Sequence, residues 1–190
     1  MADETQMVHP DILYPLSMFR RARKIPSLEY DTIDGERVPE PYRNLLVHQG
    51  DMTSRLEQFH ADRIQVRKLT SSSDGQSYFR EVVLYTVTKS SPVEYGGIEV
   101  ILSNLPEEIR KEVLEAKSPL GGILNAYRLS YSSSPLAYLT VSADEAIKAA
   151  LSLGEEPMTL YGRSNRITDH AGQELARIVE ILPPAEVVKS

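Results

Sequence analysis

The segment Glu174–Leu182, with the sequence ELARIVEIL, ends at Pro183-Pro184 and carries the most informative pattern in the chain. Successive side chains of an extended strand point to opposite faces. Alternation places Ala176, Ile178, Glu180 and Leu182 on one face and Leu175, Arg177, Val179 and Ile181 on the other. Both faces are mostly apolar, which is typical of a strand inside a sheet that is covered on both sides. The pattern therefore predicts an internal strand.

Glu180 is the exception on its face, because its neighbours there are aliphatic. A carboxylate leaves water at a high cost unless a partner compensates it. Two interpretations are open. Glu180 either forms a salt bridge or lies near the frayed end of the strand, or it is an acid held ready in a pocket.

Arg80 is a second charged residue among apolar neighbours, and it lies in the strongest strand pattern of the sequence, Tyr78–Val87 (YFREVVLYTV). Alternation places Arg80 on the same face as Val82 and Leu84. A lone arginine on a strand is usually a surface residue whose stem covers the sheet. Two opposite charges on apolar strand faces suggest more: they either pair with each other or flank a polar ligand.

Two predicted helix starts offer unpartnered backbone N–H groups. Asp51 is a good helix cap, with Met52 beside it, and a competing capping box follows one turn later. At the second predicted helix start, Pro119 fits the first helical position, which leaves the N–H groups of Leu120 and Gly121 without partners. The absence of a side chain at Gly121 would let an anion approach closely. The alternative is an ordinary short helix.

The remaining patterns predict an α+β fold with a single antiparallel sheet of about six strands and helices packed against it. Neighbouring strands are joined as antiparallel hairpins, and Pro and Gly residues punctuate an irregular connection at residues 25–41. Further strands are predicted at residues 63–70, 98–102, 129–141 and 158–168, and helices at residues 16–24, 106–117 and 142–153.

Composition excludes several classes of protein. The 190 residues are 41% hydrophobic, which suffices for one domain with a real core. There is no cysteine, and the four histidines lack metal-binding spacing, so we expect no disulfide and no metal. A net charge of −6 argues against a nucleic-acid partner. The polar N-terminus and the absence of a long apolar run predict a soluble, cytoplasmic protein without a membrane partner.

Six segments occur in an order that resembles the chorismate pyruvate-lyase family and its chorismate-lyase-like relatives. They are DMTSRLEQF at 51–59, YFREVVL at 78–84, PVEYGGIEVILSNL at 92–105, SPLGGIL at 118–124, YGRSNRI at 161–167 and RIVEILPP at 177–184. Residues 45–184 would form the family's domain, followed by a tail at 185–190. Residues 1–44 match poorly, and the helix at 142–154 is an addition to the family's pattern.

The resemblance implies an enzyme that converts chorismate to 4-hydroxybenzoate and pyruvate without a cofactor, for ubiquinone biosynthesis, as a monomer or homodimer. It assigns substrate binding to Met52, Arg80, Leu120 and Glu180, and Gly121 joins them as a point of close approach. Arg80 would bind a carboxylate. Glu180 would bind the ring hydroxyl, either as the catalytic base or as a positioning group. Arg80 and Glu180 are thus the predicted catalytic residues.

Two alternatives to this enzyme remain open. The chain could be a related lyase that acts on another enolpyruvyl or aromatic acid. It could also be a non-catalytic ligand-sensing domain, since the effector domains of a class of bacterial winged-helix repressors resemble the same fold. No basic helix-turn-helix pattern precedes the core, which favours the enzyme. Fold alone does not fix function, however, and a sensor of an aromatic acid would use the same arginine.

Overall fold

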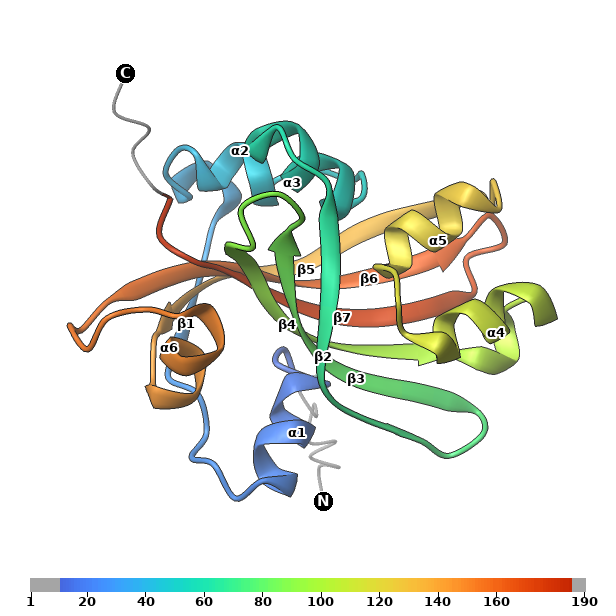
Figure 1. The fold of residues 1–190 in the computed structure, drawn as a ribbon, viewed down its shortest axis with the longest axis horizontal. Helices are drawn as coiled ribbons and strands as arrows, with labels where there is room; N and C mark the ends of the chain where they lie inside the picture. The colour runs from blue at the N-terminus through green and yellow to red at the C-terminus, as the bar shows by residue number, and fades with distance from the viewer. Residues whose placement is uncertain (1–10, 186–190) are drawn as a thin grey trace, which may run out of the picture.

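A seven-stranded antiparallel sheet forms the centre of the computed structural model, which describes residues 11–185 (Figure 1). Its strands, in spatial order, are β1 (Tyr30–Ile33), β5 (Tyr131–Ser142), β6 (Thr159–Asp169), β7 (Glu174–Leu182), β4 (Pro92–Ile101), β3 (Ser77–Thr86) and β2 (Ile64–Ser73). The helices are α1 (Leu16–Ala22), α2 (Tyr42–Leu46), α3 (Met52–His60), α4 (Glu107–Glu115), α5 (Leu120–Ala126) and α6 (Glu145–Leu151), with short 3₁₀ turns at Gly35–Arg37 and Leu102–Asn104. The predicted α+β class with one antiparallel sheet is confirmed.

β7 occupies the middle of this sheet, as its apolar faces predict. It pairs with β6 on one side and with β4 on the other. In this register Glu180 lies opposite Arg163 of β6 and opposite Gly96 of β4. The predicted hairpin between residues 158–168 and 174–182 is also present. Glu180 therefore lies near the centre of the sheet, well away from any frayed edge.

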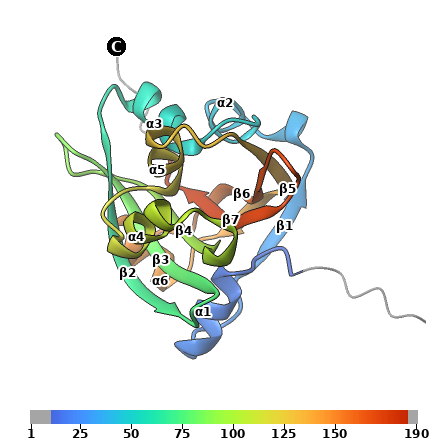
Figure 2. The same cartoon turned by 90° about the vertical axis from the view of Figure 1, so that its right-hand side faces the viewer.

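Helices cover both faces of the sheet. α2, α3 and α5 lie above it in Figure 1, while α1 and α6 lie below, and the turned view of Figure 2 keeps the same two layers. The lower layer packs onto the faces of β4, β5 and β7, where Val179, Ile181 and Tyr95 are fully buried with Leu16 of α1 and Ile147 of α6. The upper layer leaves a cavity between its helices and the sheet, described below.

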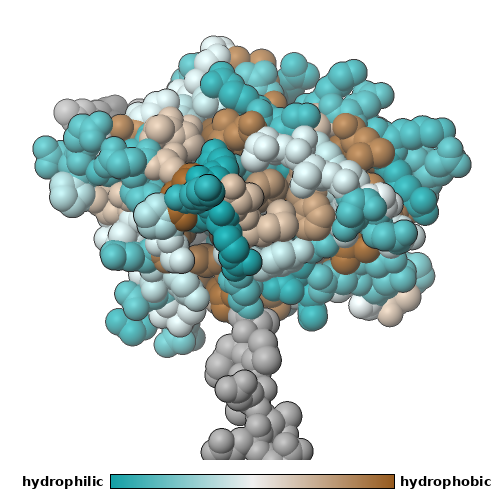
Figure 3. Space-filling model, turned by 90° about the horizontal axis from the view of Figure 1, so that it is seen from below, coloured by the Kyte–Doolittle hydropathy of each residue, from teal (hydrophilic) through white to brown (hydrophobic). Residues whose placement is uncertain are grey.

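Two ion pairs, each with one buried partner, fasten α1 to the lower face. Arg20 is only 2% exposed and bonds both to Asp144, which caps α6, and to the carbonyl of Pro26. Arg23 bonds to Glu81, which is fully buried in β3. Two of the basic residues at positions 20–24, Arg20 and Arg23, are therefore held in ion pairs. Seen from this side, hydrophilic residues surround the apolar ones that gather toward the middle (Figure 3).

The N-terminal segment belongs to the same sheet. Within the predicted segment 1–44, β1 pairs with β5 and adds the seventh strand, in a region that the sequence indicated to be irregular. The helix predicted at 142–153 begins only at Glu145, because Ser142 still belongs to β5. Residues 1–10 and most of the predicted tail lie outside the described residues. Within residues 11–185, no helix is both long and apolar enough to cross a membrane.

Gly96 is required where β4 approaches β7. A Cβ atom added at Gly96 would lie 2.5 Å from the backbone carbonyl oxygen of Val179, and backbone cannot rotate away as a side chain can. We expect Gly96→Ala to lower the free energy of unfolding by about 1–3 kcal/mol, the usual cost of overpacking. Urea denaturation measures this. Gly154→Ala is the matched control, since an added Cβ there meets no atom within 4 Å. Equal stability of the two variants would contradict the close approach.

Candidate ligand-binding site

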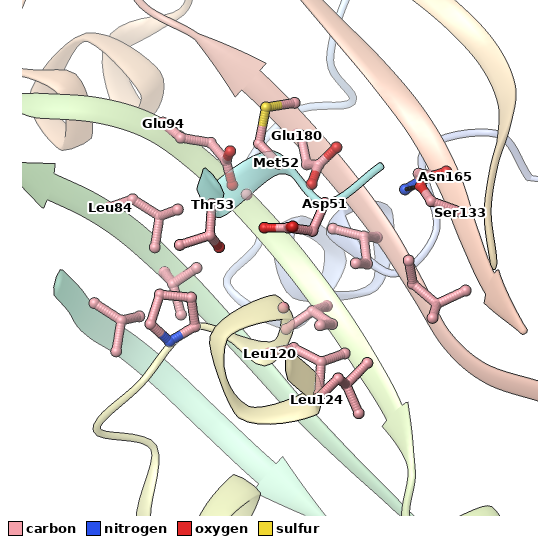
Figure 4. A pocket seen from close by; sticks show the side chains of 18 of the residues that line it. Asp51, Met52, Thr53, Leu84, Glu94, Leu120, Leu124, Ser133, Asn165 and Glu180 are labelled. Carbon is pink, nitrogen blue, oxygen red and sulfur yellow. Dashed lines mark hydrogen bonds between the residues drawn. The ribbon is translucent and has the colours of Figure 1, made fainter. Parts of the chain in front are cut away.

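A cavity lies between the starts of α3 and α5 and the upper face of the sheet (Figure 4). The cavity opens to solvent at its mouth, and its inner space for the centres of water-sized molecules is about 70 Å³. Most of its wall is apolar. The aliphatic residues are Val66, Val82, Leu84, Ile98, Leu120, Leu124, Ile167 and Ile178, and the polar and charged ones include Arg80, Glu94, Ser133, Arg163, Asn165 and Glu180.

Arg80 lies in the wall of this cavity without an acidic partner. Its side chain is 2% exposed, and its Nη2 donates to the carbonyl oxygen of Ser118 at 3.1 Å. Within residues 11–185, Nε and Nη1 of Arg80 are buried and have no hydrogen-bond partner. Burial lowers the pKa of Arg80, yet a guanidinium stays charged in proteins. A buried cation with unmet donors is costly unless an anion joins it, so this end of the cavity is suited to bind one.

Glu180 has a protein partner, and that partner is not Arg80. Arg163, opposite Glu180 in β6, donates from Nε to Oε2 of Glu180 at 2.5 Å. Arg163 is 1% exposed, and its Nη1 donates to the carbonyl oxygens of Leu46 at 3.0 Å and His48 at 3.2 Å. The salt-bridge interpretation of Glu180 therefore describes the structure, although Glu180 lines the cavity as well.

Glu94 is a buried acid of the cavity that the sequence reasoning missed. It is 5% exposed, lies two residues from Gly96 on the same face of β4, and its Oε2 has no partner within the described residues. Burial, and after it the neighbouring Glu180 carboxylate, raise the pKa of Glu94 well above its usual range, against the opposing effect of Arg163. Glu94 thus stays protonated at pH values that ionise a free glutamate.

The starts of the two helices close the cavity from above. Asp51 caps α3 as predicted, with its Oδ1 accepting from the N–H of Ser54 at 2.7 Å, and Met52 is 5% exposed. Leu120 begins α5 and is 5% exposed. A Cβ atom added at Gly121 would lie 3.1 Å from the Cβ of Asp51. The missing side chain at Gly121 therefore lets α5 pack close to the start of α3.

All five residues predicted from the sequence, Met52, Arg80, Leu120, Gly121 and Glu180, line this one cavity. Their role in ligand binding stays a prediction. The sequence reasoning also missed a polar pair in the wall, in which Asn165 donates to the hydroxyl of Ser133 at 2.8 Å. Over the described part of the chain, no three His, Asp or Glu residues are grouped so as to hold a metal ion.

Comparisons with known proteins identify the fold. PhnF from Mycobacterium smegmatis matches with a TM-score of 0.53 at 14% identity over 73% of this chain and 65% of PhnF, and the effector domain of PhnF matches with 0.50 at 14% identity over 71% and 89%. A possible transcriptional regulator, YydK from Bacillus subtilis, matches with a TM-score of 0.48 at 12% identity, over 63% of this chain and 58% of YydK. A transcriptional regulator of the GntR family from Bacillus cereus matches with a TM-score of 0.46 at 14% identity, over 64% of this chain and 92% of that chain.

These likenesses show a shared fold and no more, because every identity is low. The chain spans 58% of YydK and 65% of PhnF, so it corresponds to only part of those proteins. No protein-family model and no curated protein sequence matches the chain.

The prediction of a chorismate pyruvate-lyase, with its place in ubiquinone biosynthesis, is contradicted by these neighbours. The neighbour that matches with a TM-score of 0.50 is described as an effector domain, and this finding overturns the lyase prediction. The site agrees with this correction in one respect. Glu180, which the resemblance implied to be either the catalytic base or a positioning group, is held by Arg163 at 2.5 Å.

The buried acid Glu94 predicts a specific dependence of stability on pH. From about pH 4.3, the ordinary value for glutamate, up to the raised pKa of Glu94, the folded protein keeps a proton that the unfolded chain has lost. Because the unfolded state then binds fewer protons, Glu94 makes the wild type less stable as pH rises through this window. Glu94→Gln removes the titration, so its stability relative to the wild type should increase between pH 4.5 and 7, by up to about 1.4 kcal/mol per pH unit.

Chemical denaturation at several pH values measures this difference between the two proteins. Groups common to both contribute equally and cancel. Glu156→Gln, at an exposed glutamate, serves as the control and should follow the wild type at every pH. A constant difference between Glu94→Gln and the wild type from pH 4.5 to 7 would show that Glu94 titrates like an ordinary glutamate.

Proposed function

We propose that this chain is a ligand-sensing domain that binds a small organic acid in the cavity, with the carboxylate of the ligand on Arg80. One observation carries the proposal: a guanidinium that is 2% exposed keeps Nε and Nη1 unpartnered within the described residues while it lines a mostly apolar cavity. Of the five residues predicted from the sequence, Arg80 therefore has the central role.

The other charges of the cavity do not meet this need. Arg163 already pairs with Glu180. The pKa of Glu94 is raised well above its usual range, so Glu94 stays neutral at pH values that ionise a free glutamate. A carboxylate from outside supplies the missing charge, and charge-assisted bonds of this kind are about twice as strong as neutral ones. The planar donor group of arginine also orients a planar carboxylate.

The rest of the cavity indicates the body of the ligand. Aliphatic side chains from β2, β3, β4, β6 and β7 line it, and they favour an apolar ring or chain between the polar ends of the molecule. Met52 and Leu120 begin the helices above this body, and Gly121 lets those helices approach each other. A simple aromatic acid has this combination of an apolar body and one carboxylate. The likeness in fold to an effector domain supports sensing over turnover.

Substitution of Arg80 tests the proposal. Arg80→Ala should weaken the binding of 4-hydroxybenzoate by roughly 2–5 kcal/mol, the cost of truncating one partner of a buried charge pair. Arg80→Lys should also bind more weakly, since a point charge replaces a planar donor group. Isothermal titration calorimetry measures both. Arg166→Ala is the control, because Arg166 is exposed on β6, and it should bind as the wild type does. Unchanged affinity in Arg80→Ala would place the carboxylate elsewhere.

Sensing also predicts that chorismate is not consumed. Glu180 cannot accept a proton without leaving the buried Arg163 uncompensated, so we expect no release of pyruvate above the uncatalysed rate. A coupled lactate dehydrogenase assay measures pyruvate, and the binding of 4-hydroxybenzoate by the same sample shows that the protein is folded. Release of pyruvate in proportion to the wild-type protein, and its loss in Arg80→Ala, would refute the sensing assignment.

A further inference from the structure

We propose that Glu94 donates a hydrogen bond to a neutral polar group at the far end of the ligand, so that the cavity selects singly charged acids over dicarboxylates and zwitterions. This inference rests on the proposed function, because it takes the ligand carboxylate to lie on Arg80. It concerns an acid that neither the sequence patterns nor the comparisons assign to any role.

The two groups lie at opposite ends of one stretch of cavity wall. Arg80 of β3 pairs in register with Ile98 of β4, four residues from Glu94, which is roughly 13 Å along the strand. The side chains of both residues reach into the cavity between them, over the apolar surface of Val82 and Ile98. A one-ring acid with polar groups at its two ends fits such a span. Its second polar group would then meet Glu94.

The far end of the cavity already contains a balanced pair of charges. Glu94 and Glu180 extend from neighbouring strands toward the start of α3, as Figure 4 shows, and Arg163 holds Glu180 from the next strand. The half-buried imidazole of His48 adds no charge at pH 7, because burial, and then Arg163, lower its pKa to about 4. Asp51, at the mouth, adds negative charge only.

This balance determines what the far end accepts. A second ligand carboxylate would meet Glu180 and Asp51, with no free cation among the described residues that line the cavity there, and so would be repelled. A ligand cation placed beside Glu94 would meet a neutral acid, unless Glu94 ionised in a position where burial and Glu180 both oppose its charge. A neutral acceptor needs neither change. It would accept a hydrogen bond from the protonated carboxyl of Glu94 and so satisfy a buried group that has an unpartnered oxygen within the described residues.

Three nearly isosteric acids distinguish these cases, namely 4-carbamoylbenzoate with a neutral amide, terephthalate with a second carboxylate and 4-amidinobenzoate with a cation. Benzoate, which lacks the far group, is the reference. By isothermal titration calorimetry at pH 7, we expect the wild type to bind 4-carbamoylbenzoate at least about tenfold more tightly than either charged acid, and more tightly than benzoate.

Two variants test the donor itself. Glu94→Gln keeps a neutral donor of the same shape, so its affinity for 4-carbamoylbenzoate should stay within about threefold of the wild type. Glu94→Leu removes the donor and should lose about tenfold on 4-carbamoylbenzoate, the worth of one buried hydrogen bond. Both variants should bind benzoate as the wild type does, which also shows that each has folded with an intact Arg80 end.

The outcomes separate this inference from the function on which it rests. If benzoate and all three acids fail to bind the wild type, the proposed function is wrong and the role of Glu94 is lost with it. If benzoate binds but 4-amidinobenzoate binds best, with its advantage lost in Glu94→Gln, then Glu94 is an ionised cation site and only this inference is overturned. Equal binding of terephthalate and 4-carbamoylbenzoate, or an unaffected Glu94→Leu, would also overturn it alone.

Discussion

The buried ion pair between Arg163 and Glu180 joins the two central strands and also places the helix above them. Arg163 donates to Glu180 across β6 and β7, and the same guanidinium donates to the carbonyl oxygens of Leu46 and His48. Those carbonyls belong to the last residue of α2 and to the short segment that connects α2 to α3. One side chain thus fixes where α3 begins over the sheet. Because loss of either partner would leave a buried charge uncompensated, at a typical cost of about 3–5 kcal/mol, the pair constrains sheet and helix together.

Once this pair is formed, the charges around the cavity differ sharply in what they still lack. Arg163 and Glu180 satisfy each other, whereas Arg80 keeps donors without a partner in the described part of the chain. Glu94 is also buried, and burial raises its pKa so that the protonated, neutral form is favoured. Under the proposed function, these charges favour a ligand with one negative charge, which Arg80 would bind. Among the described residues that line the cavity, the only other cation, Arg163, is already paired with Glu180, and this is the basis of the proposed preference for a singly charged acid.

Much of the fold could be predicted from local pattern, and the failures have physical causes. Both faces of β7 are apolar, so alternation alone placed Glu174–Leu182 inside the sheet. β1 was missed because it has only four residues, mostly exposed, and exists through its pairing with β5. Arg20 gave no sign of burial, since its partner Asp144 is 124 residues away. Glu94 was missed because Gly96 and Gly97 interrupt the apolar alternation by which a buried face is recognised.

The enzyme prediction was wrong for a related reason, because local sequence patterns do not show contacts between distant residues. Alternation and helix-start signals found Arg80, Glu180, Met52 and Leu120, and the structure gathers these residues around one cavity. Residue types in order are compatible with a catalyst and with a binding domain alike, because the same fold serves both. The chemical role of Glu180 depends on whether its carboxylate is unengaged. That depends on Arg163, a residue of another strand that comes opposite Glu180 only when β6 and β7 pair. Pairing across strands, which no single segment of the sequence displays, therefore separates the two functions.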